Sequence, residues 1–190
     1  MSSPAPSRRW IGGTSVYFMT EDGGQVDQKN LLVTEIEAAE DARPVLYEGE
    51  ELPSLTKDRF ERGQSVILIP AFSRAHETYA IGAAEFPGLF DQPFMGWITG
   101  VALDDLERVR PMVFDSSRGT AHEDGALVLH VKLPADRTAN VEILNLFEQD
   151  GFGPEISFTG PVTFGEIAYI LLNQTMVRLQ LHGQEQAPVA

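Results

Sequence analysis

The sequence predicts an α+β fold of one domain, made mostly of antiparallel β-sheet, with a barrel or a sandwich as the options and two to four short helices. Two observations lead to this expectation. Segments in which apolar and polar residues alternate, as in half-buried strands, outnumber segments with helical periodicity. The strands and helices also lack the regular alternation that a parallel α/β fold requires.

The composition fits a single globular domain. A chain of 190 residues with 43% hydrophobic residues can bury a substantial core. No repeat and no Ser/Gly-rich linker divides the chain, so we expect the domain to span residues 10–183. The flanking residues 1–9 and 184–190 show no pattern of regular structure, and we expect disordered tails there.

Four elements are expected in the first third of the chain. The first strand covers residues 14–19 and is closed by a glycine-rich turn, and a second strand covers residues 31–38. In the second strand apolar and acidic residues alternate, which predicts one exposed face. Residues 54–62 predict a short helix that Gly63 ends. The branched run at 66–69 predicts a strand that is buried on both faces.

The elements expected after residue 72 include one segment that fits either a helix or a strand. Residues 73–86 fit a helix, although a strand at 79–84 fits nearly as well, and a helical turn is expected at 104–109. The cleanest alternation in the chain predicts a strand at 127–133. Thr163 and Glu166 have the spacing of a capping box, so a helix is expected at 164–174, followed by a last strand at 176–182.

Charge and cysteine content exclude several classes of partner and site. The chain has 28 Asp and Glu against 14 Lys and Arg, a net charge of -14. Such a chain repels phosphate backbones and anionic lipids, so we expect neither a nucleic acid nor a membrane as its partner. The absence of cysteine excludes disulfides and thiolate sites. No secretory signal or membrane-spanning run is apparent, and we expect a cytoplasmic or virion-associated location.

The familiar catalytic and cofactor motifs are missing. No nucleophile elbow, phosphate-binding loop or dinucleotide fingerprint occurs in the sequence. Two His-Glu pairs begin the zinc-helix motif, but Ala80 and Ala126 stand where its second histidine belongs. We therefore expect no cofactor, no metal and no catalytic residue.

An acidic stretch is the first candidate site. Its negative potential could accelerate association with a basic partner, and we expect Glu48, Glu50 and Glu51 to steer that encounter. A solvated strand edge and loop would explain the same residues without any function. The stretch contains a single basic residue, Arg43. Its carboxylates are Glu35, Glu37, Glu40, Asp41, Glu48, Glu50 and Glu51.

The second candidate is the aromatic segment at residues 86–97. Its two prolines and two glycines disfavour a regular element, and an irregular segment normally lies at the surface. Large aromatic side chains there would suit an interface, with Phe90, Phe94 and Trp97 as the anchors. The alternative is that these rings fold under the segment and extend the core.

The third candidate is a cationic face. If the strands at 127–133 and 176–182 pair, His130 and Lys132 would lie beside Arg178 and His182. Such a face could bind an anion or another ligand, or support acid-base chemistry. Two unrelated exposed strand faces would explain the same pattern without any function.

Three functional hypotheses follow. The first is a non-enzymatic, acidic protein-protein interaction module, of the inhibitor or immunity-protein type, that covers a basic partner. The second is a structural assembly component of a phage particle or a secretion machine. The third is a small α+β enzyme or anion-binding protein that uses the cationic face. The sequence favours the first, because it shows no nucleophile beside a base.

Overall fold

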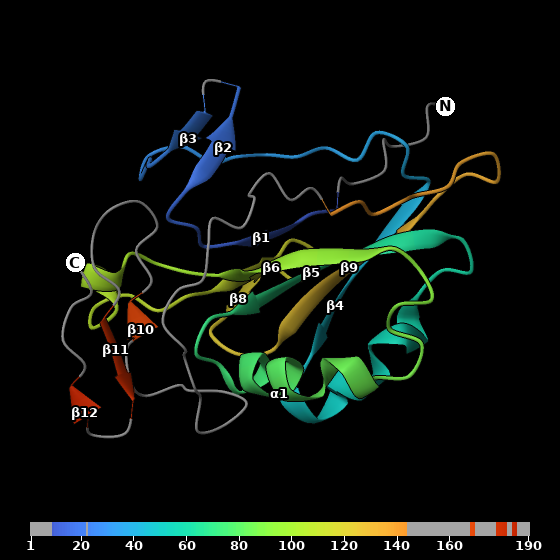
Figure 1. The fold of residues 1–190 in the computed structure, drawn as a ribbon. Coiled ribbons are helices and arrows are strands. Elements are labelled where there is room, and N and C mark those ends of the chain that lie inside the picture. The colour runs from blue at the N-terminus through green and yellow to red at the C-terminus, as the bar shows by residue number, and fades with distance from the viewer. Residues whose placement is uncertain (1–8, 22, 144–167, 170–177, 182–183, 186–190) are drawn as a thin grey trace, which may run out of the picture. The chain divides into compact units, whose positions relative to one another are not determined.

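The protein is a mixed α+β protein in which sheet predominates (Figure 1). The computed structural model describes residues 9–21, 23–143, 168–169, 178–181 and 184–185. The chain divides into two compact units, Met1–Glu142 and Ile143–Ala190. Among the described residues no helix is long and apolar enough to cross a membrane.

The first unit contains most of the regular structure. In chain order its elements are β1 (Ile11–Gly13), β2 (Phe18–Thr20), β3 (Gly23–Gln25), β4 (Asp41–Tyr47), the 3₁₀ helix η1 (Gly49–Asp58), β5 (Gly63–Pro70), α1 (Arg74–Gly82), the 3₁₀ helix η2 (Ala83–Glu85), β6 (Phe94–Thr99), the 3₁₀ helix η3 (Leu103–Asp105), β7 (Val113–Asp115), β8 (Thr120–His122) and β9 (Ala126–Lys132).

A four-stranded sheet with the order β4-β9-β5-β6 is the centre of this unit. β9 is antiparallel to both of its neighbours, whereas β5 and β6 are parallel. A parallel pair needs a crossover connection, and α1 provides it. The helix begins at Ser73, whose hydroxyl accepts a hydrogen bond from the amide of His76 at 3.1 Å, as an N-cap does.

Both faces of the inner strands β9 and β5 are covered, as Figure 1 shows for the helices on one side and β1 on the other. On the helical face, Leu52 and Leu55 of η1 and Ala75 of α1 pack on strand residues such as Val128. On the opposite face, Leu127 packs with residues of β1 and β7. The central strands are therefore buried from both sides, and the two apolar layers stabilise the unit.

The second unit contains β10 (Ala168–Tyr169), β11 (Arg178–Leu181) and β12 (Gln184–Glu185). They form an antiparallel sheet with β11 in the middle. The extent of a single domain over 10–183 and the two disordered tails stay predictions. Residues 184–185, the start of the expected C-terminal tail, lie in β12.

Several predicted elements are confirmed. The strand at 66–69 is β5, and the strand at 127–133 is β9. Of the two alternatives at residues 73–86, a helix or a strand, the structure shows a helix, α1. The turn predicted at 104–109 overlaps η3, and the last predicted strand contains β11.

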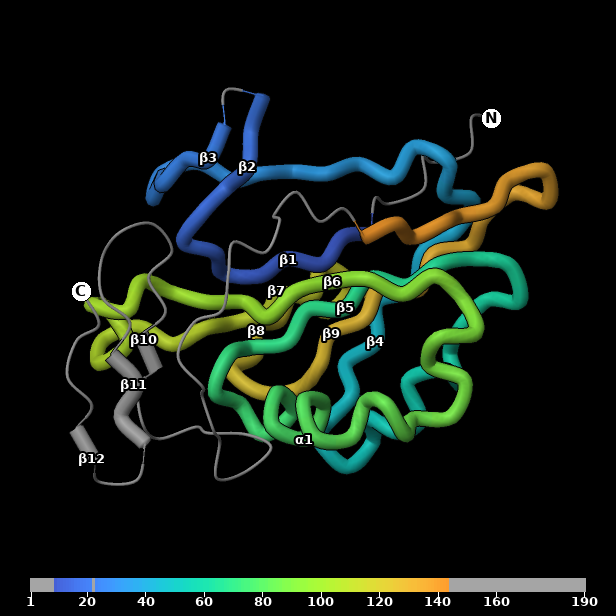
Figure 2. The backbone as a smooth tube through the Cα atoms, in the orientation of Figure 1, coloured from blue at the N-terminus to red at the C-terminus, as the bar shows by residue number. Residues whose placement is uncertain are grey.

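Other predictions are wrong. Residues 31–38 form no strand and connect β3 to β4, as the path of the chain in Figure 2 shows. Alternating apolar and polar residues give a segment an apolar face, but a strand also needs a neighbouring strand to pair with, and no described strand pairs with these residues. The helix at 164–174 is wrong at 168–169, where strand pairing with β11 outweighs the capping signal, and its other residues lie outside the described part of the chain. Residues 94–97, expected to be irregular, belong to β6. The expected helix at 54–62 is shifted, since η1 covers Gly49–Asp58.

The barrel is not seen: β4 and β6 end the central sheet without meeting. The sheet is also not wholly antiparallel, because β5 and β6 run in the same direction. One α-helix and three 3₁₀ helices are found among the described residues.

Gly96 allows β6 to approach β5 closely. A Cβ atom at this position would clash with the backbone carbonyl oxygen of Ile67, a rigid neighbour. We predict that Gly96→Ala lowers the free energy of unfolding by about 1–3 kcal/mol, measured by urea denaturation. The matched control is Gly100→Ala, since a Cβ there meets nothing within 4 Å, and it should change stability little. Equal effects of the two substitutions would contradict this account.

Candidate partner-binding site

β6 exposes large apolar side chains on both faces of the central sheet. Trp97 is 52% exposed and Met95 51%, on the face that also carries β1, and Ile98 is 39% exposed on the helical face. The strand contains no charged residue. Exposed aromatic and apolar side chains gathered on one strand are typical of a contact surface. We call Met95, Trp97 and Ile98 the β6 surface.

The backbone of β6 has one free edge. In the parallel pair, the amide of Ser65 donates to the carbonyl of Pro93 at 3.0 Å and the amide of Ala71 to Thr99 at 2.9 Å. The backbone groups of the odd-numbered residues of β6 therefore face β5, and those of Gly96 and Ile98 face away from the sheet. No described strand pairs with this side, because β6 ends the sheet.

The charged residues on either side of β6 in sequence are all acidic. No Lys or Arg occurs from residue 75 to residue 107. In the same range lie Glu77, Glu85, Asp91, Asp104, Asp105 and Glu107. The uncharged strand therefore has carboxylates on both sides of it in sequence.

The predicted aromatic segment contains both buried and exposed apolar side chains. Phe86 and Leu89 are buried in the core, whereas Phe90 is 69% exposed. Phe94 packs against the core, with the guanidinium carbon of Arg59 at 5.4 Å from its ring centre. Arg59 also donates hydrogen bonds to the carbonyls of Gly88, at 2.8 Å, and Leu89, at 2.6 Å, so it ties the segment to the core. Intramolecular contacts thus occupy Phe94, and only Phe90 and Trp97 of the predicted anchors are exposed.

The three steering glutamates lie at the start of η1. Glu48, Glu50 and Glu51 are all exposed, and the Glu51 carboxylate accepts a hydrogen bond from the Glu48 amide at 3.0 Å. This contact caps the helix, where negative charge is favourable. η1 covers the face of the sheet opposite to Trp97. The structure therefore does not bring these carboxylates together with Trp97.

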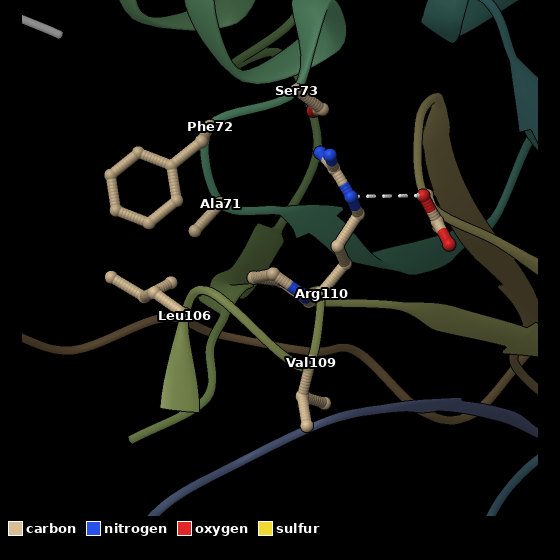
Figure 3. Close-up of a pocket in the computed structure, with 8 residues that line it drawn as sticks. Ala71, Phe72, Ser73, Leu106, Val109 and Arg110 are labelled. Atoms are coloured by element: carbon tan, nitrogen blue, oxygen red, sulfur yellow. Dashed lines mark ion pairs between the residues drawn. The ribbon is translucent and has the colours of Figure 1, made fainter. Parts of the chain in front are cut away.

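A pocket of about 310 Å³ lies where β5 and β6 end. Figure 3 shows Phe72 and Leu106 on one side of it, while Arg110 extends toward Ser73. The Arg110 Nε and a Glu123 carboxylate oxygen are 3.7 Å apart, so the two charges largely offset each other. The carboxyl ends of parallel strands are a common location for ligands.

Phe72 has an unusual backbone conformation at the mouth of this pocket. Its φ of 65° is left-handed, and it is the only non-glycine residue with positive φ in the described part of the chain. Its amide donates to the Nδ1 of His76 at 3.2 Å, and its side chain is 61% exposed. The nearby amide of Ala75 donates to the Asp124 carboxylate at 3.0 Å, so this helix terminus already holds an internal anion.

His130 lies in the core, and its predicted place on an exposed face is wrong. Since helices cover that face of β9, the ring is fully buried. Its Nδ1 lies 2.9 Å from the Ser65 hydroxyl and its Nε2 2.9 Å from the Tyr47 hydroxyl, which donates to the Asp58 carboxylate at 2.8 Å. All these contacts are satisfied by a neutral ring that accepts from Ser65 and donates to Tyr47. Burial lowers the pKa of His130 to about 4.

The rest of the cationic face is not assembled either. β4 and β5 occupy both edges of β9, so the strand at 178–181 cannot pair with it. Lys132 is exposed and forms an ion pair with Glu40 at 2.9 Å. Arg178 belongs to β11, and His182 lies outside the described residues. No group of three or more potential metal-ligating side chains occurs among the residues that the structure describes.

Comparison with known proteins places this chain in a family. Residues 3–159 and 154–182, most of the chain, match the model of a family of unknown function, DUF6976. The chain belongs to this family. No curated protein and no solved structure shows a significant match to it.

Sequence reasoning missed part of the site. Met95 and Ile98 were not identified as site residues. Their place on the edge strand β6 depends on strand order, which no local pattern reveals. Phe72 follows a strand-ending proline, Pro70, and this turn position was the only local signal for it. The contacts of His130 join four segments distant in sequence, so no spacing could predict them.

The conformation of Phe72 can be tested by comparing two substitutions that both remove its ring. Asn adopts the left-handed region more readily than other non-glycine residues. We predict that the Phe72→Asn protein is more stable than the Phe72→Ala protein by about 1 kcal/mol, measured by urea denaturation. Equal stabilities would mean that the backbone conformation at residue 72 imposes no cost.

The buried His130 should make stability depend on pH. The unfolded histidine binds a proton near its usual pKa of about 6.5, whereas the folded ring binds one only near pH 4. Stability is therefore full above pH 6.5 and falls by up to about 3 kcal/mol as the pH decreases from 6.5 to 4. In His130→Asn this part of the pH dependence should be missing, whereas in His122→Asn, outside the core, it should persist. Denaturation midpoints at several pH values measure it, and an unchanged slope in His130→Asn would contradict the assignment.

Proposed function

We propose that this protein is a non-enzymatic, acidic interaction module that binds a basic protein, in the manner of an inhibitor or immunity protein. The observation that supports this most is the β6 surface, with Met95 and Trp97 each half exposed on an uncharged strand. Burial of such side chains in a partner is the main source of tight binding. The partner would cover the β6 surface and Phe90.

The charge of the chain supports a basic partner. A net charge of -14 attracts cationic surfaces at long range, and exposed carboxylates such as Glu48, Glu50 and Glu51 add to this field. Exposed ion pairs are each worth only about 0–1 kcal/mol, so charge alone cannot hold a complex tightly. In this proposal the carboxylates accelerate association and Trp97 slows dissociation.

The alternatives have weaker support. A structural assembly component would use the same exposed surface, and the two proposals differ in whether the partner is a single basic protein or a particle. An enzyme based on the cationic face is disfavoured, because His130 is buried, is neutral above pH 4 and is fully engaged by Ser65 and Tyr47. Ligand binding is a second candidate function, favoured by the pocket beside the strained Phe72.

Affinity purification from the native cells, followed by mass spectrometry, would identify the partner. With the purified complex, we predict that Trp97→Ala raises the dissociation rate tenfold or more, corresponding to about 1.4 kcal/mol or more, with little change in the association rate. Reversing Glu48, Glu50 and Glu51 to Lys should slow association and reduce its salt dependence. Surface plasmon resonance at several salt concentrations measures both effects.

Two controls make this test specific. Reversal of three exposed glutamates elsewhere, Glu21, Glu37 and Glu142, changes the net charge equally and should slow association less. Denaturation of Trp97→Ala should show a small loss of stability, because half of the side chain is already exposed. A loss of several kcal/mol with unchanged partner affinity would show that Trp97 serves the core, and would overturn the proposal.

A further inference from the structure

The free edge of β6 defines how a partner can be bound, and this inference rests on the proposed function. The amide and carbonyl groups of Gly96 and Ile98 point away from β5, and no described strand pairs with them. Beyond them, the amide of Gly100 donates to the carbonyl of Thr14 at 3.1 Å. The edge is therefore already used at one end, by this chain's own backbone, and from Phe94 to Ile98 no described residue pairs with it.

We propose that an extended segment of the basic partner binds β6 by strand addition, with an apolar centre and Lys or Arg residues at its ends. Backbone hydrogen bonds to Gly96 and Ile98 would provide affinity, and alternate side chains of the segment would contact Met95 and Trp97 on one face and Ile98 on the other. Strand addition uses both features of β6 together, its free backbone and its exposed apolar side chains.

The acidic residues on either side of β6 favour a basic partner segment over a second copy of this chain. A partner strand of the stated kind would place its basic ends toward the carboxylates that precede and follow β6, which include Asp91 and Asp104. A second copy of this chain fits worse. Antiparallel pairing of two β6 strands would bring the Asp91 end of one copy toward the Asp104 end of the other, and like charges repel.

The test begins with a phage-displayed library of random linear peptides, selected on the full-length protein. Selected peptides should share an apolar, β-branched or aromatic centre with basic flanks. When such a peptide binds, the amides of Gly96 and Ile98 should exchange with solvent at least about tenfold more slowly, as newly bonded amides do. The amides of Met95 and Trp97 are the internal control, because they already face β5 and should change less.

A pair of substitutions isolates the outward backbone bond. Ile98→Pro removes an amide that β5 does not use, and proline is tolerated on the exposed side of an edge strand. We predict that it weakens peptide binding at least about tenfold, whereas Ile98→Val, which keeps the amide, changes binding little. Isothermal titration calorimetry measures both affinities. The exchange measurement uses the wild-type protein and decides the question even if Ile98→Pro does not fold.

The outcomes separate this inference from the proposed function. If Trp97→Ala abolishes peptide binding but Ile98→Pro and amide exchange at Gly96 and Ile98 show no effect, the β6 surface binds by side chains alone and strand addition is wrong. If the selected peptides are not basic and Trp97→Ala leaves their binding unchanged, the proposed function itself fails. A dimer in sedimentation that dissociates on Ile98→Pro would show that a second copy occupies the edge, which also overturns strand addition by a partner.

Discussion

The burial of β9 is the constraint on which the rest of the first unit depends. This strand pairs with β4 on one edge and β5 on the other, and apolar layers cover both of its faces. A strand enclosed in this way cannot leave a polar group unsatisfied. The network from Ser65 through His130 and Tyr47 to Asp58 meets that requirement, and it also joins the sheet to η1. Among the described strands, the sheet therefore ends at β4 on one side and at β6 on the other.

The sequence predicted β5 and β9, because β5 is a branched run and β9 alternates cleanly. It left α1 open against a strand, and it predicted neither β4 nor β6 as a strand. Burial on both faces of β9 was not predicted, since Val128 and His130 look like the exposed half of an alternating strand until helices cover them. Local pattern also misled at residues 31–38, which pair with no described strand, and at residues 168–169, which pair with β11 instead of forming a helix.

The candidate site was predicted only in part. Trp97 was identified from its residue type, but not as a member of a strand, because Pro93 and Gly96 suggested an irregular segment. Phe94 has the same residue type as Phe90 and is nonetheless engaged by Arg59. Phe90 lies in the turn before β6, whereas Phe94 lies in the strand and packs against the core. Which ring is exposed therefore depends on tertiary contacts, and a single sequence does not contain that information locally.

The contact between Gly100 and Thr14 has a consequence for the solubility of the chain. An uncharged strand such as Phe94–Thr99, rich in aromatic and apolar residues, is the kind of segment that stacks into cross-β aggregates when a long edge is exposed. Two features of the native fold oppose this. Thr14 occupies the last outward position, which leaves an edge too short for extended stacking, and Gly96 interrupts the row of side chains. Displacement of the segment around Thr14 would expose the Gly100 amide and lengthen the edge.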